Sequence, residues 1–229
     1  MKNPLNYQVT EYDCGPTTVL NAVSCLFKRE EIPPVIIKHI MTYCLDSCND
    51  KGEFGKGGTS RIAMMYMSNW FNQYHTVQDF PIRCEYLTGA AVTVGPDTLL
   101  TRGLRQGAVA VVRLWYGCWH YVLFTGADRR SVHLFDPYFR KIPFAESGIT
   151  VVSDRPSRMN RKVEFELLEE ECKGVYALGP RETREAVLML NLSHKRGRAF
   201  AECLPPLPTK PDAPAGRRSA GRRGNSGKA

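Results

Sequence analysis

The sequence predicts an α+β domain in which a helical layer carrying a cysteine packs on an antiparallel sheet carrying a histidine and an aspartate. Amphipathic helical patterns occupy the first third of the chain, and segments with strand character follow from about residue 81. Helices and strands that are separated along the chain in this way are typical of α+β domains. We therefore expect a cleft between the two layers, in which an extended peptide can lie.

The first predicted helix covers residues 14–27. Apolar side chains recur within it at helical spacing, at Val19, Leu20, Val23, Leu26 and Phe27. Asp13 is a favoured N-cap residue and Pro16 fits a first turn, so we expect the helix to begin at Cys14. A thiol in this position lies at the positive end of the helix dipole, which favours the nucleophilic thiolate.

The remaining elements follow from periodicity and caps. Two more helices are expected, one from Pro33-Pro34 to about residue 45 and one from Thr59-Ser60 through Phe71. The other expected elements are strands at 81–87 and 108–115, a short helix at 97–105 capped by Asp97, a half-buried strand through Val163, Phe165 and Leu167, and a segment at 186–192 that fits either a strand or a helix.

A β-hairpin is predicted to pair a histidine with an aspartate. Residues 119–126 and 131–137 have strand character, and the polar turn between them is centred near Asp128. Residues equidistant from that centre lie opposite one another, which places His120 across from Asp136, with Cβ atoms about 5 Å apart. The carboxylate is then expected to accept from Nδ1–H, leaving Nε2 for a thiol. The apolar floor below this pair is formed by Val122, Phe124, Val132 and Leu134.

These residues supply the parts that cysteine catalysis needs. A thiolate nucleophile requires an adjacent base, a group that orients the base, and donors for the oxyanion. Cys14, His120 and Asp136 fit the first three roles. Gln8 lies six residues before the cysteine and is expected to provide one oxyanion donor, with the backbone N–H of Cys14 as the second.

Three motifs, Gln8-x4-Asp13-Cys14-Gly15, His120-Tyr121-Val122 and Asp136-Pro137, give this chain a family resemblance. It resembles papain-like cysteine peptidases, most closely the double-glycine leader peptidase domains of bacteriocin exporters and their stand-alone relatives. The resemblance covers about residues 5–140 and implies a papain-like fold, with Cys14 as nucleophile, His120 as base, Asp136 as orienting residue and Gln8 in the oxyanion hole. No transporter segment follows, and residues 141–195 do not fit the family pattern.

The expected activity is hydrolysis of a peptide bond in a peptide or protein substrate, with a separate peptide exporter as a candidate partner. Gly117 and Trp119 are expected to line the substrate cleft beside His120, because the glycine keeps the approach open. Two alternatives remain open at this point. One is an acyltransferase that uses the same thioester intermediate, and the other is a non-catalytic module that binds leader peptides.

No metal or cofactor is expected. Cys44-x3-Cys48 and Cys118-x-His120 do not match the usual zinc-ligand pairs. The glycine-rich segment 50–58 lacks the Gly-Lys-Ser/Thr of a phosphate-binding loop. We assign no role to the cysteines other than Cys14.

The net charge of +8 is concentrated at the C-terminal end of the chain. Residues 205–229 contain six basic residues and one acidic one, a net charge of +5, which leaves +3 for residues 1–204. This segment is rich in Pro, Gly and Ala and has no apolar periodicity. We therefore expect a peptidase domain at 1–204 and a disordered basic tail at 205–229, and we regard nucleic acid as an unlikely partner.

The expected location is the cytoplasm. The N-terminal residues are not followed by the apolar segment of a signal peptide, and no apolar run approaches the length of a transmembrane span. Eight cysteines in a chain without a secretory signal indicate reduced thiols.

Overall fold

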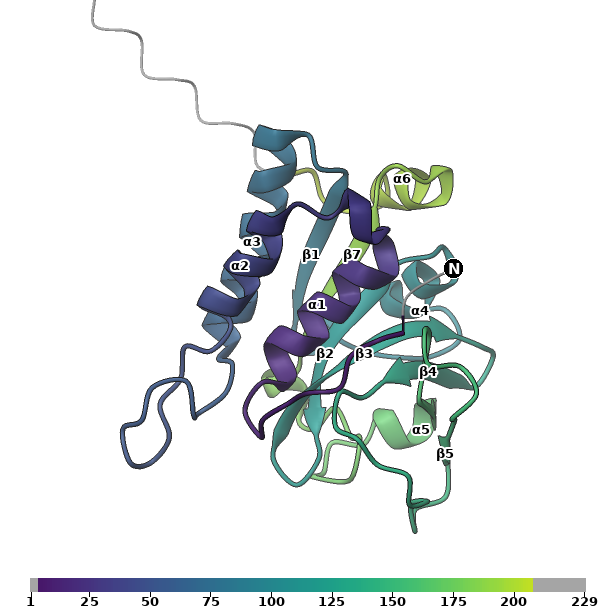
Figure 1. Cartoon of the computed structure of the whole chain (residues 1–229). Coiled ribbons are helices and arrows are strands. Elements are labelled where there is room, and N and C mark those ends of the chain that lie inside the picture. The colour runs from purple at the N-terminus through teal and green to yellow at the C-terminus, as the bar shows by residue number, and fades with distance from the viewer. Residues whose placement is uncertain (1–3, 208–229) are drawn as a thin grey trace, which may run out of the picture.

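The computed structural model describes residues 4–207 and has a mixed α+β fold (Figure 1). One seven-stranded sheet has the strand order β1-β7-β2-β3-β4-β6-β5, and every neighbouring pair of strands is antiparallel. Six α-helices complete the described part of the chain. The α+β class and the antiparallel sheet predicted from the sequence are thus confirmed.

The helices are α1 (Cys14–Leu26), α2 (Pro34–Tyr43), α3 (Arg61–Gln78), α4 (Leu99–Arg105), α5 (Phe165–Leu168) and α6 (Lys195–Ala201). The strands are β1 (Ile82–Thr88), β2 (Val109–Trp115), β3 (Trp119–Ala127), β4 (Ser131–Phe135), β5 (Ile149–Val151), β6 (Arg161–Glu164) and β7 (Glu185–Asn191).

The sheet separates two hydrophobic cores. Side chains alternate between the faces of each strand. In the central strands, Val111, Leu123 and Val187 therefore pack in the core on the α1 side, which also contains residues of α2 and α3. Their neighbours Val112 and Val122 face the second core, to which α4, α5 and α6 contribute. Figure 1 shows α1, α2 and α3 grouped together, and α4 and α6 away from them.

Strand β7 is buried along its whole length and lies between β1 and β2. A strand covered on both faces lacks the alternation of polar and apolar residues that identifies a half-exposed strand. For this reason residues 186–192 were ambiguous in the sequence, and the structure resolves them as a strand.

Two local predictions were wrong. The strand expected through Val163, Phe165 and Leu167 ends at Glu164, and the short helix α5 begins with Phe165, which is buried. Helix α4 is capped by Thr98 and not by Asp97. The hydroxyl of Thr98 accepts from the backbone N–H of Thr101, and the Thr101 side chain accepts from the N–H of Thr98, which completes a reciprocal capping box.

The register of the β3–β4 hairpin also differs from the expected one. Leu123 pairs with Phe135, and a β-bulge follows Phe124. Extended by one pair, this register places Asp136 opposite Val122, two residues away from His120. A slip of two residues keeps a side chain on the same face of the sheet, whereas a slip of one would reverse it. The histidine and the aspartate therefore remain on one face, on diagonal positions.

Residues 169–184 are tied to the rest of the fold by Arg184, which is buried. Its guanidinium donates to the carbonyl oxygens of Gly179, Val92 and Glu169, and it forms an ion pair of 2.7 Å with the Glu169 carboxylate. Planar guanidinium groups suit such multiple contacts. Arg184 thus fixes the loop that leads from α5 to β7.

None of the helices within residues 4–207 is both long and apolar enough to span a membrane. Most of the predicted basic tail, residues 208–229, lies outside the described residues.

Replacing Arg184 by leucine is expected to lower the free energy of unfolding by about 3 kcal/mol, because it leaves Oε2 of Glu169 and several buried carbonyl groups without the arginine donor. Arg181→Leu is the matched control, since Arg181 pairs with Glu171 at the surface and such pairs contribute about 0–1 kcal/mol. Urea unfolding of both variants measures the difference. Equal losses would show that Arg184 does not anchor this loop.

Candidate active site

Cys14 is the first residue of α1 and is buried at the boundary between that helix and β3. The helix is fastened to the strand by Thr18, whose hydroxyl donates to the backbone oxygen of Tyr121 at 3.0 Å. Beside the cysteine, Gly15 lies so close to Thr59 that an added Cβ would collide with that side chain. Glycine at this position therefore allows the loop before α3 to approach the start of α1.

Asp13 occupies the N-cap position, but the expected side-chain cap is absent. Its carboxylate instead accepts from the backbone N–H groups of Val9 and Thr10, at 3.1 and 2.8 Å, and from the Thr10 hydroxyl. Asp13 thus stabilises the turn that precedes the helix. The first turn of α1 consequently has no side-chain cap on its N–H groups, which keeps them available to an anion.

The structure brings His120 together with both expected partners. Its Nε2 lies 2.7 Å from Oδ1 of Asp136, and the Cys14 thiol is close enough to the imidazole to help raise its pKa. Since Nε2 is engaged by the carboxylate, Nδ1 is the ring nitrogen that is left to interact with the thiol. The predicted contact between His120 and Asp136 is confirmed, whereas the ring nitrogen predicted to make it was wrong, because rotation of the ring about its side-chain bonds is not fixed by strand register.

Asp136 is fully buried, and its carboxylate accepts three hydrogen bonds. Oδ1 accepts from His120 and from the backbone N–H of Tyr138 at 2.8 Å, and Oδ2 accepts from the hydroxyl of Tyr176 at 2.6 Å. The Asn160 side chain holds the backbone of Asp136 by donating to its carbonyl and accepting from its N–H, at 2.7 and 2.8 Å. Both carboxylate oxygens and the backbone of Asp136 are therefore fixed by hydrogen bonds.

The sequence analysis missed Tyr176 and Asn160. Both come from the segment after residue 140 that does not fit the family pattern, and they lie 40 and 24 residues from Asp136 along the chain. No local motif marks either of them. In the structure Tyr176 stands out by its backbone, since its φ of 63° lies in the left-handed region that residues other than glycine rarely adopt.

Burial and charge act in opposite directions on the imidazole. Burial by itself would lower the pKa of His120, but the charge of Asp136, together with the hydrogen bonds to Asp136 and Cys14, outweighs it and raises the pKa to about 10. Burial and the nearby Asp136 charge raise the pKa of Tyr176 well above its ordinary value. Tyr176 therefore remains a hydrogen-bond donor at neutral pH, and the site favours the imidazolium form of His120.

Gln8 lies at the edge of this site. Its backbone N–H donates to the carbonyl of Pro137 at 2.9 Å, directly after Asp136. The carboxamide Nε2 donates to the Thr10 carbonyl at 2.8 Å, and the buried Oε1 has no hydrogen-bond partner among residues 4–207. The backbone of Gln8 is thus tied to the residue after Asp136, and one of its two amide hydrogens is already engaged by Thr10.

Gly117 lies in the turn between β2 and β3, and Trp119 is the first residue of β3. Gly117 has a φ of 75° and open space around its Cα, as a tight turn requires. Trp119 packs edge-on against Trp115, and the guanidinium carbon of Arg113 lies 4.1 Å above its ring. Both predicted cleft residues are therefore on the chain segment that leads into His120.

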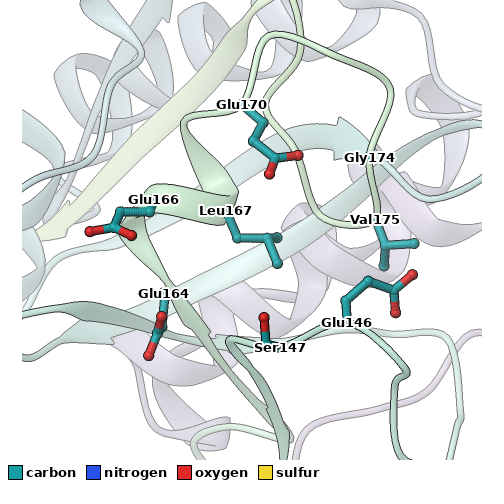
Figure 2. A pocket seen from close by; sticks show the side chains of 8 residues that line it. All are labelled: Glu146, Ser147, Glu164, Glu166, Leu167, Glu170, Gly174 and Val175. Atoms are coloured by element: carbon teal, nitrogen blue, oxygen red, sulfur yellow. The ribbon is translucent and has the colours of Figure 1, made fainter.

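A separate hollow lies near α5 and contains four glutamates (Figure 2). It is lined by Glu146, Ser147, Glu164, Glu166, Leu167, Glu170, Gly174 and Val175, and none of the predicted site residues borders it. Within residues 4–207, no group of three or more His, Cys, Asp or Glu side chains is placed to hold a metal ion.

No known family model matches the sequence, and no curated protein is detectably similar to it. The structure itself therefore defines the class, which is an α+β protein with a buried cysteine and a buried, hydrogen-bonded histidine–aspartate pair.

Substituting Asp136 by asparagine is expected to lower the pKa of His120 from about 10 to below its ordinary value, because burial then acts without the opposing carboxylate charge. Wild-type His120 should remain protonated at pH 8, and the variant should be neutral. Titration of the imidazole resonances by NMR measures both values. A wild-type transition near pH 6.5 would contradict the electrostatic account.

Proposed function

We propose that this protein is a papain-like cysteine peptidase that hydrolyses peptide bonds with Cys14, His120 and Asp136. The single observation that carries this proposal is the His120 imidazole hydrogen-bonded to the buried Asp136 carboxylate, with the Cys14 thiol close enough to help raise the pKa of that imidazole. A nucleophile, a base and an orienting group in this order are the arrangement that covalent catalysis requires.

In the proposed reaction His120 takes the thiol proton, and the Cys14 thiolate attacks the carbonyl carbon of the scissile peptide bond. The resulting oxyanion is stabilised by the uncapped backbone N–H of Cys14 and by the second amide hydrogen of Gln8. The imidazolium then gives its proton to the departing amine, which leaves a thioester on Cys14. Water, deprotonated by the neutral imidazole, hydrolyses the thioester and restores the thiol.

Asp136 acts in this scheme by holding the imidazole and stabilising its charged form. The donors on Asp136 matter because a misdirected carboxylate would no longer align the ring with the thiol. Tyr176 and Asn160 support the proposal in this respect, since each fixes a different part of the aspartate. We include them as positioning residues.

The proposed substrate is a peptide or a protein, and a separate peptide exporter remains a candidate partner. A cytoplasmic location also belongs to the proposal, because thiols are kept reduced in that compartment and the reduced form of Cys14 is the nucleophile.

Incubation with a peptide library is expected to give products with new C-termini and a transient acyl adduct on Cys14, both detected by mass spectrometry. Cys14→Ser should abolish turnover. Asp136→Ala should lower kcat by about 10²–10⁴-fold and retain measurable activity, because the aspartate orients the base and does not react.

Other outcomes of this experiment decide between the alternatives. Amine-conjugated products without cleavage would identify an acyltransferase that uses the same thioester. Peptides that bind under reducing conditions without any adduct or product would identify a non-catalytic binding module and overturn the peptidase proposal.

Gln8→Ala is expected to lower kcat by about 10²–10³-fold with little change in KM, since the lost donor acts on the oxyanion and not on the bound substrate. Gln78→Ala, at the end of α3, is a suitable control for the loss of a carboxamide elsewhere. Steady-state kinetics on a library-derived substrate measures the effect. A loss below threefold would exclude Gln8 from the oxyanion hole.

A further inference from the structure

We propose that Arg113, held against the ring of Trp119, binds a carboxylate group of the substrate beside Cys14. This inference rests on the proposed function and adds the chemical class of the substrate, a peptide that carries an acidic group close to the scissile bond.

Strand pairing places Arg113 on the same face of the sheet as the nucleophile. Arg113 in β2 pairs with Tyr121 in β3 and with Glu185 in β7, so these three side chains share the face that α1 covers. The pKa of the Tyr121 hydroxyl is raised well above its ordinary value. Burial is the largest cause and the contacts with Glu185 come next, and the charges of Arg113 and Cys14 also affect this pKa. Tyr121 thus links the arginine and the cysteine within one electrostatic environment.

The negatively charged group next to Arg113 is the Glu185 carboxylate, and it already has hydrogen-bond donors on both oxygens. Glu185 is fully buried, and it accepts from the Tyr121 hydroxyl on one oxygen and from Arg61 Nε and the Tyr86 hydroxyl on the other, at 3.0 and 2.9 Å. One carboxylate therefore faces two arginines. Its ion pair is with Arg61, which leaves Arg113 as the surplus positive charge.

The Arg113 guanidinium has few partners of its own. Within residues 4–207, its one recorded hydrogen bond is a long contact of 3.5 Å from Nη1 to the carbonyl of Thr183. Burial lowers the pKa of Arg113 despite the nearby Tyr121 and Glu185. A half-buried guanidinium that has lost water without gaining a close anion is well suited to an anionic ligand.

Trp119 gives this guanidinium a fixed orientation. The guanidinium carbon lies 4.1 Å from the centre of the indole ring, which is the distance of a cation–π contact. A guanidinium that stacks on an aromatic ring can still present its planar edge, with parallel N–H groups, to a carboxylate. Trp119 directly precedes His120 in β3, so the two side chains point to opposite faces of the strand, and Arg113 and Trp119 lie on the face that also holds Tyr121.

The expected ligand is the carboxylate of an acidic side chain or of a peptide C-terminus. The two sources share the same chemistry, and probes can distinguish them. N-iodoacetyl peptides are suitable probes, because the iodoacetyl group alkylates Cys14 while a short glycine spacer allows the carboxylate to reach Arg113 from either side of the thiol.

The experiment compares matched probes on the full-length protein. One set carries Glu-amide, Gln-amide or Gln with a free C-terminal carboxylate after one glycine, and a second set has two glycines. Wild-type protein is expected to be alkylated at Cys14 at least about fivefold faster by an acidic probe than by its neutral partner, in at least one spacer length. The Glu-amide and free-acid probes separate the two sources of the carboxylate.

Arg113→Gln is expected to bring this rate ratio close to one, and Arg105→Gln, an exposed arginine on α4, should retain the wild-type ratio. The ratio cancels any change in thiol reactivity, since both probes are attacked by the same sulfur of Cys14. If Arg113→Gln does not fold, the wild-type ratio is measured against salt concentration, and it should fall as salt screens the charge.

A wild-type ratio near one, or the same ratio in Arg113→Gln, would overturn this inference and leave the peptidase proposal intact. The peptidase proposal fails separately if neutral probes alkylate Cys14 no faster than the exposed Cys203 at pH 6.

Discussion

The arrangement of the site depends on the burial of one carboxylate, that of Asp136. An ionised carboxyl group removed from water is strongly destabilising unless donors replace the lost hydration. Here the donors come from three separate parts of the chain, namely His120 on β3, the backbone N–H of Tyr138 just after Asp136, and Tyr176 far along the sequence. These groups converge on Asp136, and their convergence holds the imidazole in place beside Cys14.

Residues beyond 140 contribute to the site, because Tyr176 and Asn160 contact Asp136. The loop that carries Tyr176 is fixed by Arg184, and its backbone adopts a left-handed conformation at the tyrosine. Such a conformation costs of order 1–3 kcal/mol and persists where the surroundings determine it. The hydroxyl contact with Asp136 and the buried ring supply that determination. The second half of the chain therefore takes part in building the site.

Local patterns in the sequence predicted the helix that begins at Cys14, the central strands and the pairing of His120 with Asp136. The pairing was found in spite of a wrong register, because a slip of two residues preserves the face of a strand. The ring nitrogen that faces the thiol was assigned wrongly, since side-chain rotation leaves no trace in periodicity. Tyr176 was missed because a contact across 40 residues has no local signature.

The most direct test of the account is the rate at which iodoacetamide alkylates each cysteine near pH 6. An ordinary thiol contains under about 1% thiolate at that pH. Cys118 and Cys203 are exposed and serve for comparison. Burial raises the pKa of Cys44 to about 12, so that thiol should be inert. If Cys14 and His120 form a thiolate–imidazolium pair, Cys14 should react much faster than all of these, and His120→Gln should remove the difference. Equal rates at Cys14 and the exposed cysteines would contradict the proposed catalytic role.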